Sequence, residues 1–140
     1  MVDILGILRL LKKELSTDKE RKKEWQLAED VATMYLKKEK HYKILERNFK
    51  TPFGEIDIIA SHKGKLIFVE VKSGNSTKIA PAERVDFRKY KKMLNSAEYF
   101  INQIKHNKQN FEKFKEFQID VIEIRFGKIT HYEDVGWDFN

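Results

Sequence analysis

The chain has 140 residues, the length of one domain, so it can bury one core but not two of ordinary size. Lys and Arg outnumber Asp and Glu by 28 to 22, and the resulting net charge of +6 favours encounters with polyanions such as nucleic acid. Because the chain has no cysteine, disulfides, thiolate zinc sites and a cysteine nucleophile are excluded.

The N-terminal segment, residues 2–11, is apolar but is interrupted by Asp3 and Arg9. It is too short to span a bilayer, and it lacks the order of charge and cleavage site of a secretion signal. We therefore expect a cytoplasmic protein without membrane contact. Residues 1–23 are expected to form a helical extension, which packs on the domain or joins two copies in a homodimer, and residues 24–140 form the domain itself.

Hydrophobic periodicity predicts a helix and then a run of strands. The helix starts near Trp25, where apolar residues recur at helical spacing. Three strands follow at residues 41–48, 55–60 and 66–72, and the short turn between the last two predicts a hairpin.

The second half of the chain predicts a long helix and another hairpin. Pro81 suits the start of the helix, whose apolar positions continue to Ile104. Residues 117–126 and 129–135 are rich in strand-forming residues, and Gly127-Lys128 between them predicts a two-residue turn. This order of elements predicts the α/β class, with a mixed sheet flanked by helices.

Charged residues interrupt two of the apolar strands. Side chains of a strand alternate between its faces, so Glu55 and Asp57 should share one face, opposite Ile56 and Ile58. In the next strand Glu70 and Lys72 should likewise share a face. If the two strands pair, three carboxylates and one ammonium group converge on one side of the sheet, where charges are costly unless they are paired or bound to a metal.

This pattern has two interpretations. In the first, Asp57 and Glu70 bind Mg²⁺ or Mn²⁺ through carboxylate oxygens, and Lys72 orients water or stabilises the charge of a phosphate in the transition state. In the second, Lys72 forms an ordinary cross-strand salt bridge with Glu70 or Asp57. Glu29 lies at the edge of the apolar stripe of the first helix, where it either pairs with a lysine or reaches the same site as a fourth acid.

The residues around these charges resemble a known family. The chain is similar to the YraN-like uncharacterised bacterial family and, through it, to the archaeal Holliday-junction resolvases and the PD-(D/E)xK nuclease superfamily. The resemblance runs from about Trp25 to the C-terminus. It is carried mainly by Gly54-Glu55-Ile56-Asp57-Ile58-Ile59-Ala60, Phe68-Val69-Glu70-Val71-Lys72, Ala28-Glu29-Asp30 and Ile119-Asp120-Val121.

The resemblance implies a restriction-endonuclease-like core and a nuclease that hydrolyses DNA, branched or structured, by attack of a metal-activated water. Asp57 and Glu70 match the two metal-binding acids, Lys72 the catalytic lysine and Glu29 the first-helix glutamate of the resolvase-like branch. Glu55 belongs to the family's Gly-Glu-Ile-Asp signature. We therefore expect catalysis and Mg²⁺ or Mn²⁺ binding at these residues, with DNA preferred to RNA.

The chain departs from the family pattern outside the acids and the lysine. Ser73-Gly74 replaces Thr-Arg, so an arginine that would contact phosphate is missing, and Gln118 replaces an arginine. These departures favour an alternative: a module with a nuclease-like fold that binds nucleic acid or a protein partner without turnover.

Basic residues crowd the start of the second long helix. They either grip the phosphate backbone of nucleic acid or form a solvated helix face. The residues are Arg84, Arg88, Lys89, Lys91 and Lys92. Asp120, in an apolar strand, predicts a buried structural ion pair. The four histidines lack the spacing of metal ligands on a helix, and we interpret them as surface or turn residues: His41, His62, His106 and His131.

Overall fold

One mixed sheet with a helix on each face makes up the part of the chain that this computed structural model describes, residues 20–74, 87–106 and 113–136. The elements in chain order are helix α2 (Glu20–Lys38), strands β1 (Lys43–Thr51), β2 (Gly54–His62) and β3 (Lys65–Ser73), helix α3 (Phe87–Lys105), and strands β4 (Glu116–Arg125) and β5 (Lys128–Tyr132).

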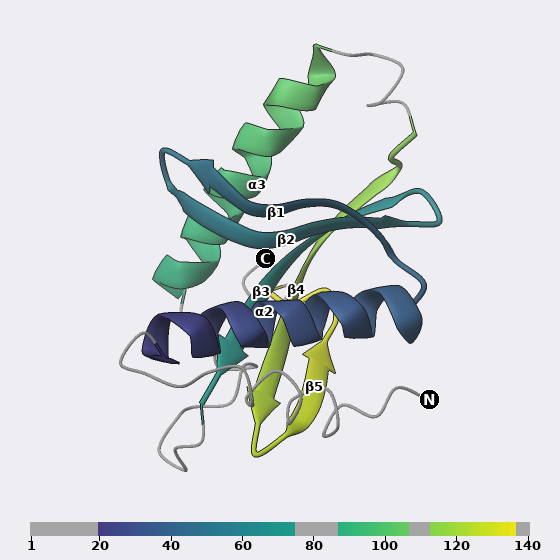
Figure 1. Ribbon diagram of the computed structural model, residues 1–140. Helices are drawn as coiled ribbons and strands as arrows, with labels where there is room; N and C mark the ends of the chain where they lie inside the picture. The colour runs from purple at the N-terminus through teal and green to yellow at the C-terminus, as the bar shows by residue number, and fades with distance from the viewer. Residues whose placement is uncertain (1–19, 75–86, 107–112, 137–140) are drawn as a thin grey trace.

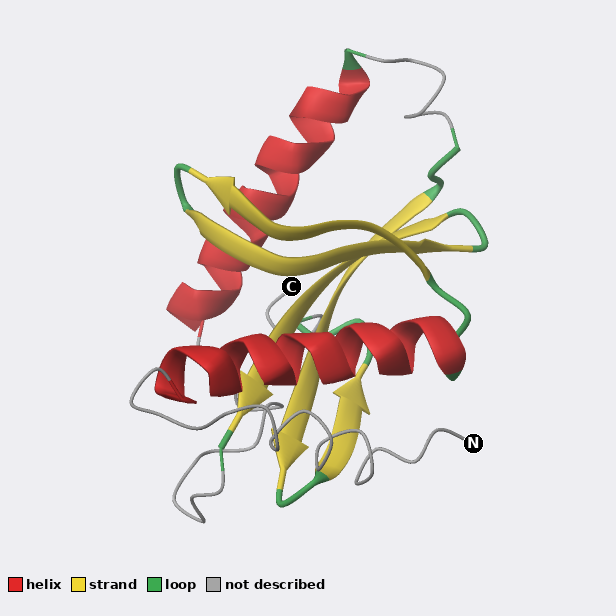
Figure 2. Cartoon of the chain, viewed as in Figure 1, coloured by secondary structure: helices red, strands yellow, loops and turns green. Residues whose placement is uncertain are grey.

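The sheet has the strand order β1-β2-β3-β4-β5. The pair β3–β4 is parallel and the other three pairs are antiparallel. Helix α2 crosses one face of the sheet and α3 covers the other (Figure 1), and colouring by secondary structure shows the two layers of helix clearly (Figure 2). The predicted α/β class with a mixed, helix-flanked sheet is therefore confirmed, and the arrangement is consistent with a restriction-endonuclease-like core.

Each helix covers its own hydrophobic core. Under α2, residues such as Val31 and Leu36 pack on Ile58, Val69 and Ile122 of the sheet. Under α3, the buried residues are Ile56, Ile59, Leu66, Phe68, Tyr90, Ala97, Phe100, Ile119 and Val121. Because β2, β3 and β4 bury both faces, they read in the sequence as nearly continuous apolar runs, and a charged residue within them stands out.

Two of the tight turns adopt left-handed backbone conformations. Lys63 and Gly64 have φ angles of 48° and 80°, and Phe126 and Gly127 have angles of 51° and 74°. Positive φ at both central residues is the type I′ pattern that suits the twist of a hairpin. The last hairpin therefore turns at Phe126-Gly127, one residue before the predicted Gly127-Lys128, and β5 begins at Lys128.

The first strand starts two residues later than predicted. His41 has a φ angle of 58°, and the N–H of Tyr42 donates to the carbonyl of Leu36 at 2.9 Å. The chain is thus still leaving α2 at residues 41–42, and β1 runs from Lys43 to Thr51.

Some predictions fall outside the described residues. Helix α2 is described from Glu20, and residues 1–19 are not, so the predicted extension of residues 1–23 stays a prediction. The same holds for Pro81 as a helix start. In the described part of the chain, no helix has the length and apolar character needed to cross a membrane.

The feature that positions the site is a gap between β2 and β3. Their pairing runs only from Ile58↔Val69 to His62↔Lys65. Before Ile58, β2 pairs with β1 alone, and beyond Val69, β3 pairs with β4 alone. A notch therefore opens in the sheet beside Asp57, on a level with Glu70 and Val71.

Candidate functional site

Asp57 lies in the notch and bridges it with its side chain. Its Oδ2 accepts a hydrogen bond from the backbone N–H of Val71 at 2.8 Å. Burial raises the pKa of Asp57 to about 7; the bond from Val71 opposes this rise, and the negative charges of Glu29, Glu70 and Glu55 add to it. A carboxyl group that resists ionisation in this way is stabilised as a carboxylate by any cation that reaches it.

Glu29 and Glu55 bring two further carboxyl groups to Asp57. One oxygen from each of Glu29, Glu55 and Asp57 lies within 4.8 Å of the others. Glu29 comes from α2 and is only 4% exposed, whereas Glu55 is exposed at the start of β2. Burial raises the pKa of Glu29, against the opposing effects of a hydrogen bond with Asn48 and the charge of Arg47. The sequence predicted that Glu55 and Asp57 converge with Glu70, and left open whether Glu29 pairs with a lysine or joins them. In the structure the acid that meets Glu55 and Asp57 is Glu29, and we call these three residues the carboxylate cluster.

Glu70 lies close to this cluster but is not part of it. Its charge contributes to the raised pKa of Asp57, and both residues line a small cavity with Glu55 and Met93. Its Oε1 pairs with Nζ of Lys89 on α3 at 3.2 Å, while its Oε2 is buried without a hydrogen-bond partner. The second interpretation of the pattern, a salt bridge between Lys72 and Glu70 or Asp57, does not appear among the ion pairs of the described residues, where Glu70 pairs with Lys89 of α3 instead.

Lys72 faces the same side of the sheet as Glu70. In the parallel pair of β3 and β4 its register partner is Glu123, which is 7% exposed. Burial lowers the pKa of Lys72, as does the neighbouring charge of Lys89, whereas Glu70 and Glu123 oppose the change. The ammonium group of Lys72 is thus influenced by the carboxylates of Glu70 and Glu123 and by the positive charge of Lys89.

The predicted division of β2 into two regular faces is wrong in one respect. Ile56 packs in the core under α3, whereas Ile58 packs in the core under α2. The segment before Ile58 pairs with β1 alone, and two-stranded ribbons twist more strongly than wider sheets. Ile56 lies on the α3 side, while one carboxyl oxygen each of Glu55 and Asp57 lies within 4.8 Å of one of Glu29.

The donor set fits a hard divalent cation. Three carboxylate oxygens converge in the carboxylate cluster, and Oε2 of Glu29 is buried without a hydrogen-bond partner. An unpartnered buried carboxylate oxygen is costly, and a cation with oxygen ligands removes that cost. Mg²⁺ or Mn²⁺ therefore suits the cluster better than a metal that prefers nitrogen or sulfur.

Three residues near the cluster received no role from the sequence. Arg47 of β1 donates to Asp30 at 2.6 Å and lies 4.0 Å from Glu29. Asn48, with a φ angle of 52°, hydrogen bonds with Glu29. Glu123 is the register partner of Lys72. Arg47 and Asn48 had a signal in the sequence, because the stretch Ile44-Leu45-Glu46-Arg47-Asn48-Phe49 also belongs to the family resemblance.

The region of the chain that matches known proteins includes the residues of the candidate site. A model of the uncharacterised protein family UPF0102 matches residues 28–124. The chain belongs to the UPF0102 family. It is 60% identical over 118 residues to a UPF0102 protein of Fervidobacterium nodosum, covering 84% of this chain and 85% of that one. It is also 46% identical to a UPF0102 protein of Pseudothermotoga lettingae, covering 79% and 96%, and 39% identical to one of Thermotoga petrophila, covering 80% and 95%.

The UPF0102 match contains the whole candidate site. Glu29, Glu55, Asp57, Glu70 and Lys72 all fall inside residues 28–124. The resemblance to the YraN-like family is thus confirmed, and the PD-(D/E)xK superfamily is a coarser attribution consistent with it. The relatives' descriptions name a family and no activity.

The basic residues at the start of α3 that were predicted to bind nucleic acid lie only partly within the described residues. Arg88, Lys91 and Lys92 are exposed at the start of the helix, and Lys89 is engaged with Glu70. Arg84 lies outside the described residues. Nucleic-acid binding by these residues stays a prediction.

Asp120, for which the sequence predicted a buried structural ion pair, has a buried structural partner in His131. It is fully buried, and its carboxylate accepts hydrogen bonds from Gln118, from the backbone N–H of Asp134 and from His131, the last at 2.7 Å. The interpretation of His131 as a surface or turn residue is wrong: its side chain is 6% exposed, in β5, and its Nδ1 is hydrogen bonded to Tyr35 at 3.0 Å. Sequence spacing missed it because the two partners come from other elements.

Proposed function

We propose that this UPF0102 protein is a metal-dependent nuclease-type phosphodiesterase that hydrolyses DNA. The observation that carries the proposal is the convergence of Glu29, Glu55 and Asp57 within 4.8 Å, with Lys72 and Glu70 on the adjoining strand. Mg²⁺ or Mn²⁺ held by the carboxylates would supply an activated water and offset the charge of the phosphate.

The chain's own residues have separate tasks in this reaction. Glu29, Glu55 and Asp57 hold the cation, and the bond from Val71 fixes the orientation of Asp57. Lys72 offers an ammonium group, which hydrogen bonds to a phosphate oxygen and offsets the negative charge that develops when water attacks phosphorus in line. Glu70 is available as a further ligand once Lys89 turns to a DNA phosphate instead.

The competing function is a binding module without turnover. The ion pair between Glu70 and Lys89 favours it, because in this arrangement one of the two expected metal-binding acids is already neutralised. Ser73, where the family has a threonine followed by arginine, points the same way. DNA binding through α3 would then persist without cleavage.

Cleavage assays separate the two functions. Labelled linear duplex, single-stranded and four-way-junction DNA would be incubated with the protein and Mg²⁺ or Mn²⁺. For the nuclease we expect cleavage that falls by a factor of about 100 or more in Asp57→Asn and Lys72→Met. Glu98→Gln, which removes an exposed acid on α3, is the matched control and should cleave normally.

Two outcomes would count against the nuclease. If the wild type cleaves none of the substrates but shifts them in a gel, and the shift needs Arg88 and Lys91, the binding module is supported. If cleavage occurs but survives Asp57→Asn and Lys72→Met unchanged, the activity does not come from this site.

A further inference from the structure

A second cavity lies at the opposite end of β2 from the carboxylate cluster. It has a volume of about 410 Å³ and is walled by the start of β1, the β2–β3 turn, the C-terminal part of α3 and the segment before β4. Ser61 on its wall lies four residues along β2 from Asp57, which corresponds to about 13 Å of strand. The cavity is therefore distinct from the carboxylate cluster.

The inner wall of this cavity is apolar and well fixed. Phe100 of α3 is 7% exposed and makes edge-to-face contacts with Phe49 and Phe68, at ring-centre distances of 5.2 and 5.9 Å. Phe114, Leu45 and Ile104 form the rest of the apolar wall and are only partly buried. Accessible apolar surface beside a rigid ring suits a flat, aromatic ligand.

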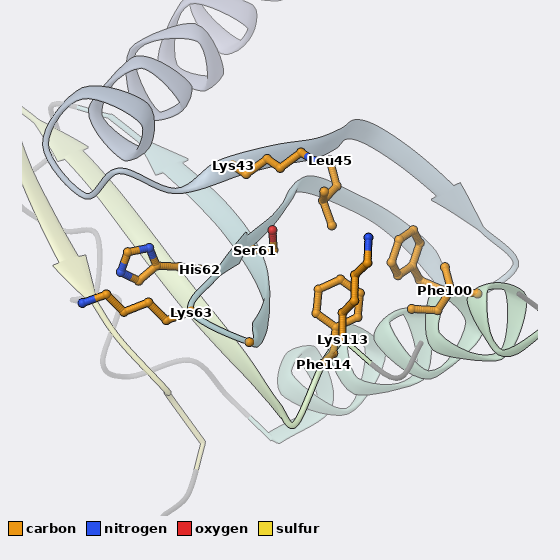
Figure 3. Close-up of a pocket in the computed structure, with 10 residues that line it drawn as sticks. Lys43, Leu45, Ser61, His62, Lys63, Phe100, Lys113 and Phe114 are labelled. Atoms are coloured by element: carbon orange, nitrogen blue, oxygen red, sulfur yellow. The ribbon is translucent and has the colours of Figure 1, made fainter. Parts of the chain in front are cut away.

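The rim of the cavity is cationic. Lys43 comes from β1 and Lys113 from the segment before β4, and Figure 3 shows both side chains at the hollow together with Ser61 and Phe114. His62 and Lys63 also line the cavity, but in Figure 3 their side chains extend away from this group. A hydrogen bond of 2.8 Å from the N–H of Lys115 to the carbonyl of Gly64 ties the segment that carries Lys113 to the turn.

The two lysines lack acidic partners in the described structure. No ion pair joins Lys43 or Lys113 to a described acid, and the described residues that line the cavity include no Asp or Glu. Two ammonium groups over an apolar wall are complementary to an anion that also carries an apolar face. A single cavity of this size holds a ligand of a few hundred Å³.

We propose that this cavity binds a nucleotide. The base lies against Phe114 and Leu45, the phosphate lies between Lys43 and Lys113, and the hydroxyl of Ser61 hydrogen bonds to the sugar or the phosphate. The nucleotide is either a free nucleoside monophosphate or one residue of a single-stranded nucleic acid, and both offer the same chemistry. Binding here requires neither the divalent cation nor hydrolysis.

Calorimetric titration of the full chain in EDTA tests this site. Thymidine 5′-monophosphate should bind more tightly than thymidine or inorganic phosphate alone. Only the nucleotide places a base against the apolar wall and a phosphate at the two lysines of the rim. We expect Lys43→Gln/Lys113→Gln to weaken the nucleotide about tenfold or more while leaving thymidine unchanged. Phe114→Leu should weaken nucleotide and thymidine alike, and thermal unfolding of each variant verifies that it is folded.

Matched controls separate this site from general charge and from the carboxylate cluster. Lys37→Gln/Lys128→Gln removes the same charge from exposed positions elsewhere and should bind the nucleotide as the wild type does. Asp57→Asn should also bind normally, so failure of the nuclease proposal would leave this one standing. If the nucleotide binds no better than phosphate, or if the two double variants weaken it equally, the proposal is overturned.

A single-stranded oligothymidylate of about eight nucleotides identifies the source of the ligand. Tighter binding of the strand than of the monophosphate, lost in Lys43→Gln/Lys113→Gln, assigns the cavity to nucleic acid. Equal binding of both, with the same loss, assigns it to a free nucleotide. Strand binding that is unaffected by this double variant and by Phe114→Leu would place the strand elsewhere and count against the proposal.

Discussion

The carboxylate of Asp57 accepts a hydrogen bond of 2.8 Å from the backbone N–H of Val71, across the gap where β2 and β3 no longer pair. The side chain thus replaces one ladder hydrogen bond of the sheet. Asp57 cannot turn away from Glu29 and Glu55 without leaving that N–H unsatisfied. The same bond that closes the sheet therefore holds three carboxyl groups together.

Replacing Asp57 by Asn should stabilise the metal-free protein at alkaline pH. The pKa of Asp57 is about 7 in the folded chain and near 3.8 in an unfolded one, so the folded chain binds more protons between these values and loses stability as the pH rises through them. Asparagine keeps an acceptor for Val71 and carries no charge. Urea unfolding in EDTA should show a gain of about 2–4 kcal/mol at pH 8 that falls towards zero near pH 4.

Glu98→Gln serves as the control for this pH dependence, since Glu98 is exposed on α3. Its free energy of unfolding should follow that of the wild type across the whole pH range. A gain for Asp57→Asn that is the same at pH 4 and pH 8 would mean that ionisation of the cluster does not oppose folding.

Divalent cations should stabilise the wild type more at pH 8 than at pH 5. At the lower pH Asp57 is largely protonated, and a protonated carboxyl group competes poorly for a metal. We expect an increase in Tm with Mn²⁺ or Mg²⁺ at pH 8 that shrinks at pH 5 and is lost in Glu29→Gln. Differential scanning fluorimetry measures this; an increase retained in full by Glu29→Gln would place the bound cation elsewhere.

The pKa of Lys72 should shift in opposite directions when Glu123 and Lys89 are each replaced by an uncharged residue. Burial already lowers its pKa, Lys89 lowers it further, and Glu123 raises it. The pKa should therefore fall in Glu123→Gln and rise in Lys89→Gln. NMR titration of carbon-13 methylated lysines reports both shifts. A pKa of Lys72 that is unchanged in Glu123→Gln would show that the register partner exerts no electrostatic effect on it.

His131→Ala should strongly destabilise the fold. It removes a 2.7 Å hydrogen bond to the fully buried Asp120 and leaves the hydroxyl of Tyr35 without its partner. We expect a loss of about 2–4 kcal/mol in the free energy of unfolding. The control is His41→Asn, at an exposed position with a φ angle of 58° that asparagine tolerates, where the change should stay within about 0.5 kcal/mol. Equal effects of the two would contradict a structural role for His131.

Local pattern explains why much of the fold could be predicted from the sequence. The apolar runs 55–60 and 66–72 are long and bounded by turn residues, so both strands and their hairpin followed from them. The β4–β5 hairpin followed in the same way, but its turn was placed one residue late, because Phe126 adopts a positive φ that is unusual for a phenylalanine.

The site was predictable only as far as single strands determine it. Asp57, Glu70 and Lys72 were singled out because charges in apolar strands are costly, and Glu29 because it lies at the edge of the apolar stripe of its helix. The family resemblance then matched all four residues to site positions. The break in pairing at Ile58 could not be read from the sequence, so the opposite orientations of Ile56 and Ile58 were missed. Glu123 and His131 were missed because their partners are set by strand register and by packing between distant segments.

The mixed pairing of the sheet also has a consequence for the order in which the molecule assembles. Strands β1, β2 and β3 are joined by short turns, so they can pair early through contacts between residues that are close along the chain. The parallel partner β4 must arrive from beyond α3, which is slower because a long loop has to close first. Glu29, Glu55 and Asp57 all belong to the early part, whereas Lys72 gains Glu123 only when β4 docks. During folding, the three carboxyl groups of the carboxylate cluster would thus come together before Lys72 reaches its final surroundings.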